Sequence, residues 1–243
     1  MASTSEVGHA KNVANFQDLI QFVTGYGATY NPSKNSLKLP QLVALKEEGD
    51  NKLTEVIAQN TNYNNSVNER FAAFSNVKTL GTRLINALQT TEASKETIDD
   101  AKGFNRKLQG KRASKIETPA DPNAPAPKTI SSSQQSYDQL IQHLAGLKAV
   151  LKAEPSYTPN ETDLQVGALE LKIDDLNAKN TAVTTAYANV SNARIDRDKT
   201  LYSKTNNLIE TAQEVKKYVK SVFGATSPEY AQISGLKFTI KKD

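Results

Sequence analysis

An internal repeat is the feature that most constrains the fold of this chain. The segment NFQDLIQFVTGYGA, which begins at Asn15, aligns with SYDQLIQHLAGLKA from Ser136. Further along, YNPSKNSLKLPQL from Tyr30 aligns with YTPNETDLQVGAL from Tyr157, after a short insertion in the second copy. Self-similarity at a nearly constant spacing is the signature of a repeated supersecondary unit. We therefore predict two copies of one helical unit in tandem.

Each copy continues with a long heptad pattern. Stripe positions recur at alternating steps of three and four, which is typical of helices that pack along their length. In the second copy they are Leu169, Ile173, Leu176, Asn180, Val183, Tyr187, Val190 and Arg194, then Leu201, Thr205, Leu208, Ala212, Val215, Val219 and Val222. No Gly or Pro occurs over 168–223. We predict one long helix per copy, over about 41–91 and about 164–223.

Positions of the two long segments also match each other. Leu42, Val56, Arg70, Phe74, Ile85 and Leu88 stand opposite Leu169, Val183, Arg197, Leu201, Ala212 and Val215. Such agreement extends the repeat along the whole of each long helix. A short amphipathic helix precedes each one, over about 14–28 and about 136–153, and Ser94 and Ser227 mark the start of a short terminal helix.

The predicted organisation follows from these boundaries. Residues 1–14 form a flexible tail, 15–103 the first helical repeat, 104–135 a basic and then Pro-rich linker, and 136–243 the second helical repeat. The sequence GLKFTIKK from Gly235 alternates apolar and polar residues, which is a strand signal. We expect a minor β-ribbon there, with part of 104–131 as its partner.

Composition supports an all-α fold with a thin core. Hydrophobic residues make up 37% of the chain and Trp is absent, whereas compact domains contain about 45–50% apolar residues. A helix in an elongated body buries only one stripe. We predict a tandemly duplicated, elongated helical bundle with two long antiparallel helices, each short helix folding back on its long partner.

Residues that carry catalysis or bind metals are sparse. Cys is absent, which excludes disulfides, thiolate nucleophiles and cysteine metal sites. Of the two His residues, His9 falls in the predicted tail and His143 replaces an apolar residue on a short helix, so neither has partners at ligand spacing. No Gly-rich phosphate loop or nucleophile motif occurs. We expect no enzyme activity, no cofactor, no metal and no small-molecule substrate.

Polar residues on the long stripe form the first candidate site. Arg70 and Arg197 occupy equivalent places in the two copies, and they are joined by Arg194, Asn60 and Asn180. Polar seam residues fix helix register at some cost in stability, and this is the interpretation we favour. The alternative is a polar belt that meets a partner or another subunit.

A basic run forms the second candidate site. It contains Lys102, Arg106, Lys107, Lys111, Arg112 and Lys115, and Lys237, Lys241 and Lys242 would join it if the predicted strand pairs nearby. Such runs bind phosphate backbones or are solvated loops. Only Phe104 is interleaved, and the net charge is +4. Base stacking is therefore poorly supported, and we do not expect nucleic acid as the main partner.

Two stretches carry a family resemblance. IDDAKGFNRKLQGKR (98–112) and YVKSVFGATSPEYAQISGLKF (218–238) resemble the repeat ends of uncharacterised two-repeat helical proteins of flavobacteria-like bacteria. The resemblance spans most of the chain. It implies a bacterial origin and no particular activity, cofactor or functional residue.

Function is predicted from the architecture alone. We expect a non-enzymatic structural or protein-interaction protein that self-associates, because long seams combined with low apolar content leave helix surface for a partner. The alternatives are a toxin-like protein that inserts helices into membranes and a weak nucleic-acid adaptor. The chain has no signal-peptide core and no run of about 18 apolar residues. The default location is therefore cytoplasmic, and export without a cleaved signal stays open.

Overall fold

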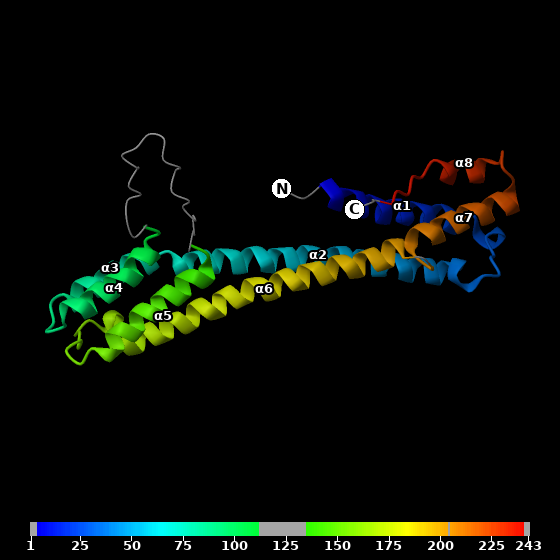
Figure 1. Cartoon of the computed structure of the whole chain (residues 1–243). Helices are drawn as coiled ribbons and strands as arrows, with labels where there is room; N and C mark the ends of the chain where they lie inside the picture. The colour runs from blue at the N-terminus through cyan, green and yellow to red at the C-terminus, as the bar shows by residue number, and fades with distance from the viewer. Residues whose placement is uncertain (1–3, 112–134, 204, 241–243) are drawn as a thin grey trace, which may run out of the picture. The chain divides into compact units, whose positions relative to one another are not determined.

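The computed structural model of the chain describes residues 4–111, 135–203 and 205–240. These residues form α-helices joined by short loops, and no strand occurs among them (Figure 1). The predicted all-α fold class is therefore confirmed for this part of the chain.

The helices are bounded as follows. They are α1 (Thr4–Gly25), α2 (Leu39–Phe74), α3 (Val77–Leu88), α4 (Lys95–Leu108), α5 (Tyr137–Ala153), α6 (Val166–Tyr202), α7 (Leu208–Phe223) and α8 (Pro228–Ser234). Three single turns of 3-10 helix lie in the loops before α2 and α6: η1 (Gly27–Thr29), η2 (Asn35–Leu37) and η3 (Thr162–Leu164).

The prediction of one uninterrupted long helix per copy is wrong. The first long segment breaks after Phe74, and the second breaks after Tyr202. At the second break Asn206 has a φ of +55°, and the side chain of Asn207 accepts a hydrogen bond from the backbone N–H of Glu210 at 2.8 Å. A left-handed residue followed by a side-chain cap ends one helix and starts the next.

The chain forms two compact units that differ from the predicted repeats. Unit 1 contains Met1–Tyr63 and Ala186–Asp243, and unit 2 contains Asn64–Thr185. The predicted boundaries at 103, 135 and 136 therefore do not delimit compact bodies. The reason is that α2 begins in unit 1 and ends in unit 2, whereas α6 begins in unit 2 and ends in unit 1.

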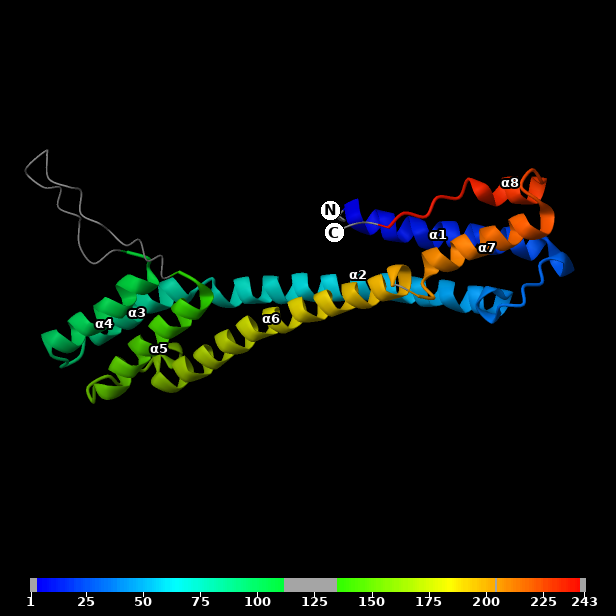
Figure 2. The ribbon, with the colours of Figure 1, turned by 45° about the vertical axis from the view of Figure 1, so that its right-hand side comes forward.

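In unit 1, α1 packs against α7 and α8. The three helices lie side by side in both views of the ribbon (Figures 1 and 2). The core beneath them is made by apolar stripes at helical spacing on α1 and α7: Val13, Phe16, Leu19, Ile20 and Val23 with Leu208, Ile209, Ala212, Val215 and Val219. Burial of such stripes supplies most of the stability of amphipathic helices.

In unit 2, α5 packs against α3 and α4 (Figure 2). Two glycines allow close approach of these helices: Gly146 faces the ring of Phe104, and Gly81 faces Leu108 and Asn105. The fully buried side chains Leu84, Leu88, Leu108, Leu144, Leu147 and Leu151 fill the space between the helices.

Each short helix contacts other helices besides its predicted long partner. Within unit 1, α1 packs against α7 and α8, and Val13 of α1 also lies against Gly49 of α2. Within unit 2, α5 makes its main contacts with α4 and α3. The apolar stripe of each short helix therefore shares a core with helices from both halves of the sequence, and periodicity alone does not identify all of them.

The predicted stripe is one residue out of register along part of α6. Ala186 and Ala193 are buried, whereas Tyr187 is 61% exposed and Arg194 is exposed. An α-helix drifts about 20° per heptad relative to a strict 3.5-residue repeat, so the neighbouring residue takes the core position. Arg197 stays on the stripe and is only 4% exposed.

Two further expectations are corrected at the ends of the described chain. Residues 4–14 are the first half of α1 and not a tail, and His9 on this helix is only 3% exposed. Residues 236–240 are extended but form no strand, and 104–108 belong to α4. The remaining ribbon partner, 112–131, lies outside the described residues. Side chains of α1 hold the extended segment in place of a neighbouring strand.

Candidate interaction sites

Four of the five predicted seam residues form two Arg–Asn pairs between α2 and α6, one pair in each unit. In unit 2, Arg70 Nη1 donates to Asn180 Oδ1 at 3.0 Å. In unit 1, Arg194 Nη2 donates to Asn60 Oδ1 at 3.3 Å. Arg197 belongs to unit 1 and forms an ion pair with Asp198 at 2.8 Å. Each Arg–Asn pair joins a guanidinium on one helix to an amide on the other.

The Arg70 pair is part of a larger cluster in unit 2. The Arg70 guanidinium lies 4.1 Å from the centre of the Tyr137 ring, and Asn180 Nδ2 donates to Asp138 Oδ1 at 2.8 Å. Phe74 packs edge-on against the same tyrosine ring, with centroids 4.6 Å apart. Arg70 Nε is buried without a hydrogen-bond partner. The contacts of Arg70 and Asn180 thus join α2, α5 and α6.

The Arg194 pair in unit 1 lies in a more exposed setting. Beside it the rings of Tyr63 and Tyr187 are 5.9 Å apart, and Tyr187 is 61% exposed. Ile57, one turn before Asn60 on α2, is 67% exposed. We call the set Ile57, Asn60, Tyr63, Tyr187 and Arg194 the tyrosine surface. Tyr and Arg are the residue types enriched where proteins bind one another.

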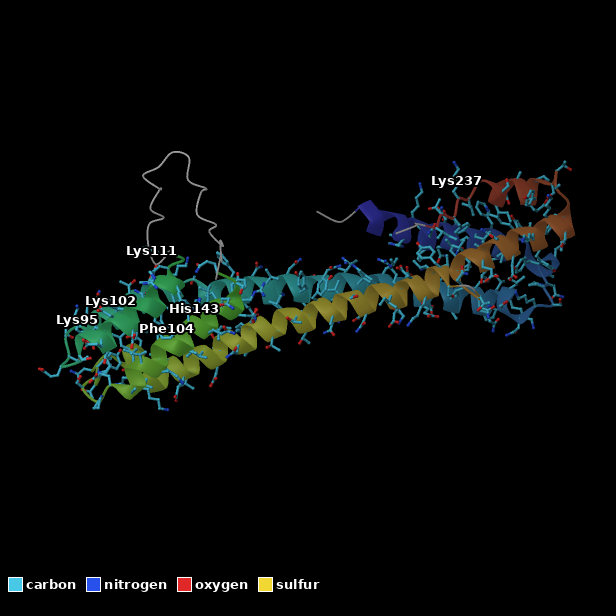
Figure 3. The ribbon with its side chains drawn as sticks, in the orientation of Figure 1. Lys95, Lys102, Phe104, Lys111, His143 and Lys237 are labelled. Carbon is cyan, nitrogen blue, oxygen red and sulfur yellow. The ribbon has the colours of Figure 1, made fainter. Side chains whose placement is uncertain are left out.

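The predicted basic run is only partly described. Lys102, Arg106 and Lys107 lie on α4 and Lys111 follows it, whereas Arg112, Lys115, Lys241 and Lys242 lie outside the described residues. Figure 3 shows Lys95 and Lys102 along α4 and Lys111 just beyond its end. Lys107 Nζ lies 5.6 Å from the centre of the Phe104 ring, and that ring packs on Gly146. The aromatic ring is therefore engaged inside unit 2.

Lys237 does not belong to the α4 run. It lies in unit 1, where its backbone carbonyl accepts a hydrogen bond from Asn15 Nδ2 at 2.6 Å. Its side chain is exposed beyond α8 (Figure 3). The strand pairing that would have joined Lys237 to the run is absent among the described residues.

The two histidines are both buried. His143 is 6% exposed on α5, at a packing position as predicted (Figure 3). His9 Nδ1 lies 2.6 Å from the hydroxyl of Tyr202. Within the described residues, no group of three or more His, Cys, Asp or Glu side chains is placed to hold a metal ion.

A polar cleft in unit 2 was not predicted. It has a volume of about 690 Å³ and lies between the end of α3 and the loop 156–164. Tyr157 lines it, and the phenol donates to the carbonyl of Leu164 at 2.9 Å. Burial, with smaller contributions from the charges of Glu161 and Asp163, raises the pKa of Tyr157 to about 12. The Arg83 ion pair holds the pKa of Asp163 below its ordinary value.

No protein-family model, no curated protein and no solved structure matches this chain. None of the described helices is both long enough and apolar enough to cross a membrane. The resemblance stated from the sequence therefore stays a prediction.

Proposed function

We propose that this chain is a non-enzymatic structural or protein-interaction protein that self-associates through the tyrosine surface. The observation that carries the proposal is the exposure of Tyr187, which is 61% exposed although its ring is already paired with Tyr63. A solvated aromatic pair beside an arginine has the composition of an interface centre.

The fine structure of this surface supports a protein partner. Ile57 supplies an exposed apolar side chain, whereas Asn60 and Arg194 hold each other at 3.3 Å. The arginine is therefore oriented before a partner arrives, which lowers the entropy lost on binding. Another copy of this chain would present the same arginine and tyrosine, and an isologous contact pairs such a surface with itself.

The proposal includes a duplicated architecture in which α2 and α6 run antiparallel about a pseudo-two-fold axis. In unit 1, Glu48 bonds Thr200 and Tyr63 meets Tyr187. In unit 2, Glu69 bonds Lys179, and Lys172 donates to the carbonyl of Ala73. From one contact to the next, the residue on α2 has a higher number and the residue on α6 has a lower number, in both units.

Matched hydrogen bonds support the duplication. The Tyr30 hydroxyl donates to the carbonyl of Leu37 at 2.7 Å, and the Tyr157 hydroxyl donates to that of Leu164 at 2.9 Å. Both tyrosines follow a short helix and precede a long one. Each bond stabilises the loop that leads into the long helix, and the two were aligned by the sequence repeat.

Light scattering and sedimentation of the full chain over a range of concentrations test the function. We expect a mass above that of the monomer, and Tyr187→Ser should shift the association to higher concentration. Leu171→Ser is the matched control, because Leu171 is an exposed apolar residue of the same helix, at 73% exposure, in unit 2. A chain that stays monomeric at high concentration would contradict the proposal.

A further inference from the structure

The extended segment 236–240 is held in unit 1 mainly through its backbone. The side-chain amide of Asn12 on α1 donates from Nδ2 to the carbonyl of Thr239 at 2.8 Å, and its Oδ1 accepts from the Thr239 N–H at 3.0 Å. Both main-chain groups of Thr239 are thereby satisfied by one side chain. This is the pairing that a residue of a neighbouring strand would provide.

A second asparagine continues the pattern. Asn15, one turn further along α1, donates to the carbonyl of Lys237 at 2.6 Å. Residues 237 and 239 face the same side of an extended chain, because side-chain direction and backbone groups alternate with a period of two. From α7, Lys216 Nζ donates to the carbonyls of Leu236 and Ser234. Side chains of both α1 and α7 therefore bind main-chain atoms of the segment. We call the surface that these side chains form the groove.

Side chains of the segment alternate between the core and solvent over 236–239, where Lys237 and Thr239 are exposed. Leu236 and Phe238 are half-buried and pack on the core of unit 1, and Lys216 Nζ lies 5.5 Å from the centre of the Phe238 ring. Ile240 is 63% exposed. The segment is therefore bound by two apolar anchors separated by one residue, and by main-chain hydrogen bonds that any residue except proline can make.

The groove is built around a polar side chain that needs an occupant. Asn12 is only 1% exposed, and its Nδ2 also contacts the Tyr202 hydroxyl at 3.1 Å. Without Thr239, the Oδ1 acceptor of this buried amide would lose its hydrogen bond from the Thr239 N–H. A buried polar group left unsatisfied costs far more than an exposed one. When the segment leaves, the Asn12 amide and the apolar surface beneath Leu236 and Phe238 become exposed to water, and an extended chain is the ligand that covers both.

We propose that the groove lined by Asn12, Asn15 and Lys216 is a binding site for an extended peptide with two apolar residues separated by one. In this structure residues 236–239 fill it, and in an assembly the same segment of a second copy fills it by exchange. Strand-like addition and swapping of a short segment are established ways of linking identical chains. The choice of a second copy as partner rests on the proposed self-association, whereas the groove itself does not.

The first experiment measures peptide binding to the groove, independently of any self-association. Full-length chain carrying Phe238→Ser and Thr239→Pro loses one anchor and the Thr239 donor, so its own segment should leave the groove. A labelled peptide GLKFTI should then bind this variant at least about tenfold more tightly than it binds the wild-type chain, where the groove is filled. Adding Asn12→Asp, which keeps the shape but removes the amide donor, should abolish the gain.

A peptide with serine in place of Phe238 is the matched control and should not bind. Circular dichroism shows whether each variant keeps its helices. If the Phe238→Ser, Thr239→Pro variant is helical and does not bind GLKFTI, the groove is not a peptide site and the inference fails.

The second experiment tests the second copy as occupant. One full-length chain carries Asn12→Asp, which damages the groove, and the other carries Phe238→Ser with Thr239→Pro, which damages the segment. Both carry Tyr187→Ser, so association through the tyrosine surface does not contribute. Each should be monomeric alone, and the mixture should form a one-to-one dimer by native mass spectrometry. Peptide binding without this dimer would overturn the exchange and leave the tyrosine-surface proposal untouched.

Discussion

Gly146 of α5 faces the ring of Phe104 of α4 so closely that a Cβ added at position 146 would overlap three of the ring carbons. Gly146→Ala should therefore overpack this helix pair at a cost of about 1–3 kcal/mol, which exceeds the ~1 kcal/mol of helix propensity that alanine adds. The matched control is Gly103→Ala on α4, since nothing lies within 4 Å of its Cβ position. The control should gain stability.

Urea unfolding followed by circular dichroism distinguishes the two substitutions. The midpoint should fall for Gly146→Ala and rise for Gly103→Ala. Equal shifts of the same sign would mean that the Phe104 ring moves aside freely, and that the close approach of α4 and α5 has no energetic consequence.

Asn207 starts α7 by accepting the backbone N–H of Glu210 at 2.8 Å. Asn207→Ala removes this cap and should lower the free energy of unfolding by about 1 kcal/mol. Asn206→Gly is the neighbouring control, because Asn206 has a φ of +55°, which glycine adopts without strain. Thermal unfolding should show a lower Tm for the first variant and an equal or higher Tm for the second. Unchanged Tm in Asn207→Ala would contradict the role of the cap.

The start of α7 is only partly predictable from the sequence. Asn207 and Glu210 have the spacing of a capping box, but the apolar stripe from Leu201 to Leu208 has a heptad spacing that continues across the break. Periodicity records which residues are apolar and not the one left-handed residue, Asn206, that redirects the chain. The all-α class and the stripes are predictable from periodicity. The break is not, because it depends on Asn206 and Asn207 alone.

Partner choice was less predictable for a different reason. The alternation of Leu236 and Phe238 is real, since both side chains turn toward the core. This alternation predicts a strand, yet the hydrogen-bonding partners are the side chains of Asn12 and Asn15. These residues are separated from the segment by more than two hundred positions. No local pattern indicates that an asparagine on a helix will face a particular backbone amide.

The seam residues were found from the sequence in part. The heptad pattern indicates Arg70 and Asn180, which pair at 3.0 Å, but it does not indicate the Tyr137 ring that lies beneath the guanidinium. A double-mutant cycle with Arg70→Met and Asn180→Ala should give a coupling free energy of about 1–2 kcal/mol, because a half-buried charged donor loses its acceptor.

The adjacent exposed ion pair provides the control for that cycle. Lys179 and Glu69 lie 2.8 Å apart on the same two helices. Their coupling should be smaller and should disappear in high salt, because exposed pairs are screened. If the Arg70–Asn180 coupling is equally salt-sensitive, the cluster acts as a surface pair and not as a register device.

Tyr157 makes stability depend on pH at the alkaline end. Its pKa rises from 10.0 to about 12, first because the phenol is buried and then because Glu161 and Asp163 are negative. The neutral phenol is thus favoured in the folded chain, so its contribution is complete below pH 10 and is lost as pH rises toward about 12. Tyr157→Phe should remove one late-ionising tyrosine from an absorbance titration and flatten the loss of stability over this interval. Tyr30, whose pKa is also raised by burial, should keep its own late step in that variant. Loss of both late steps from one substitution would show that the two tyrosines ionise only when the whole chain unfolds, and not within their separate loops.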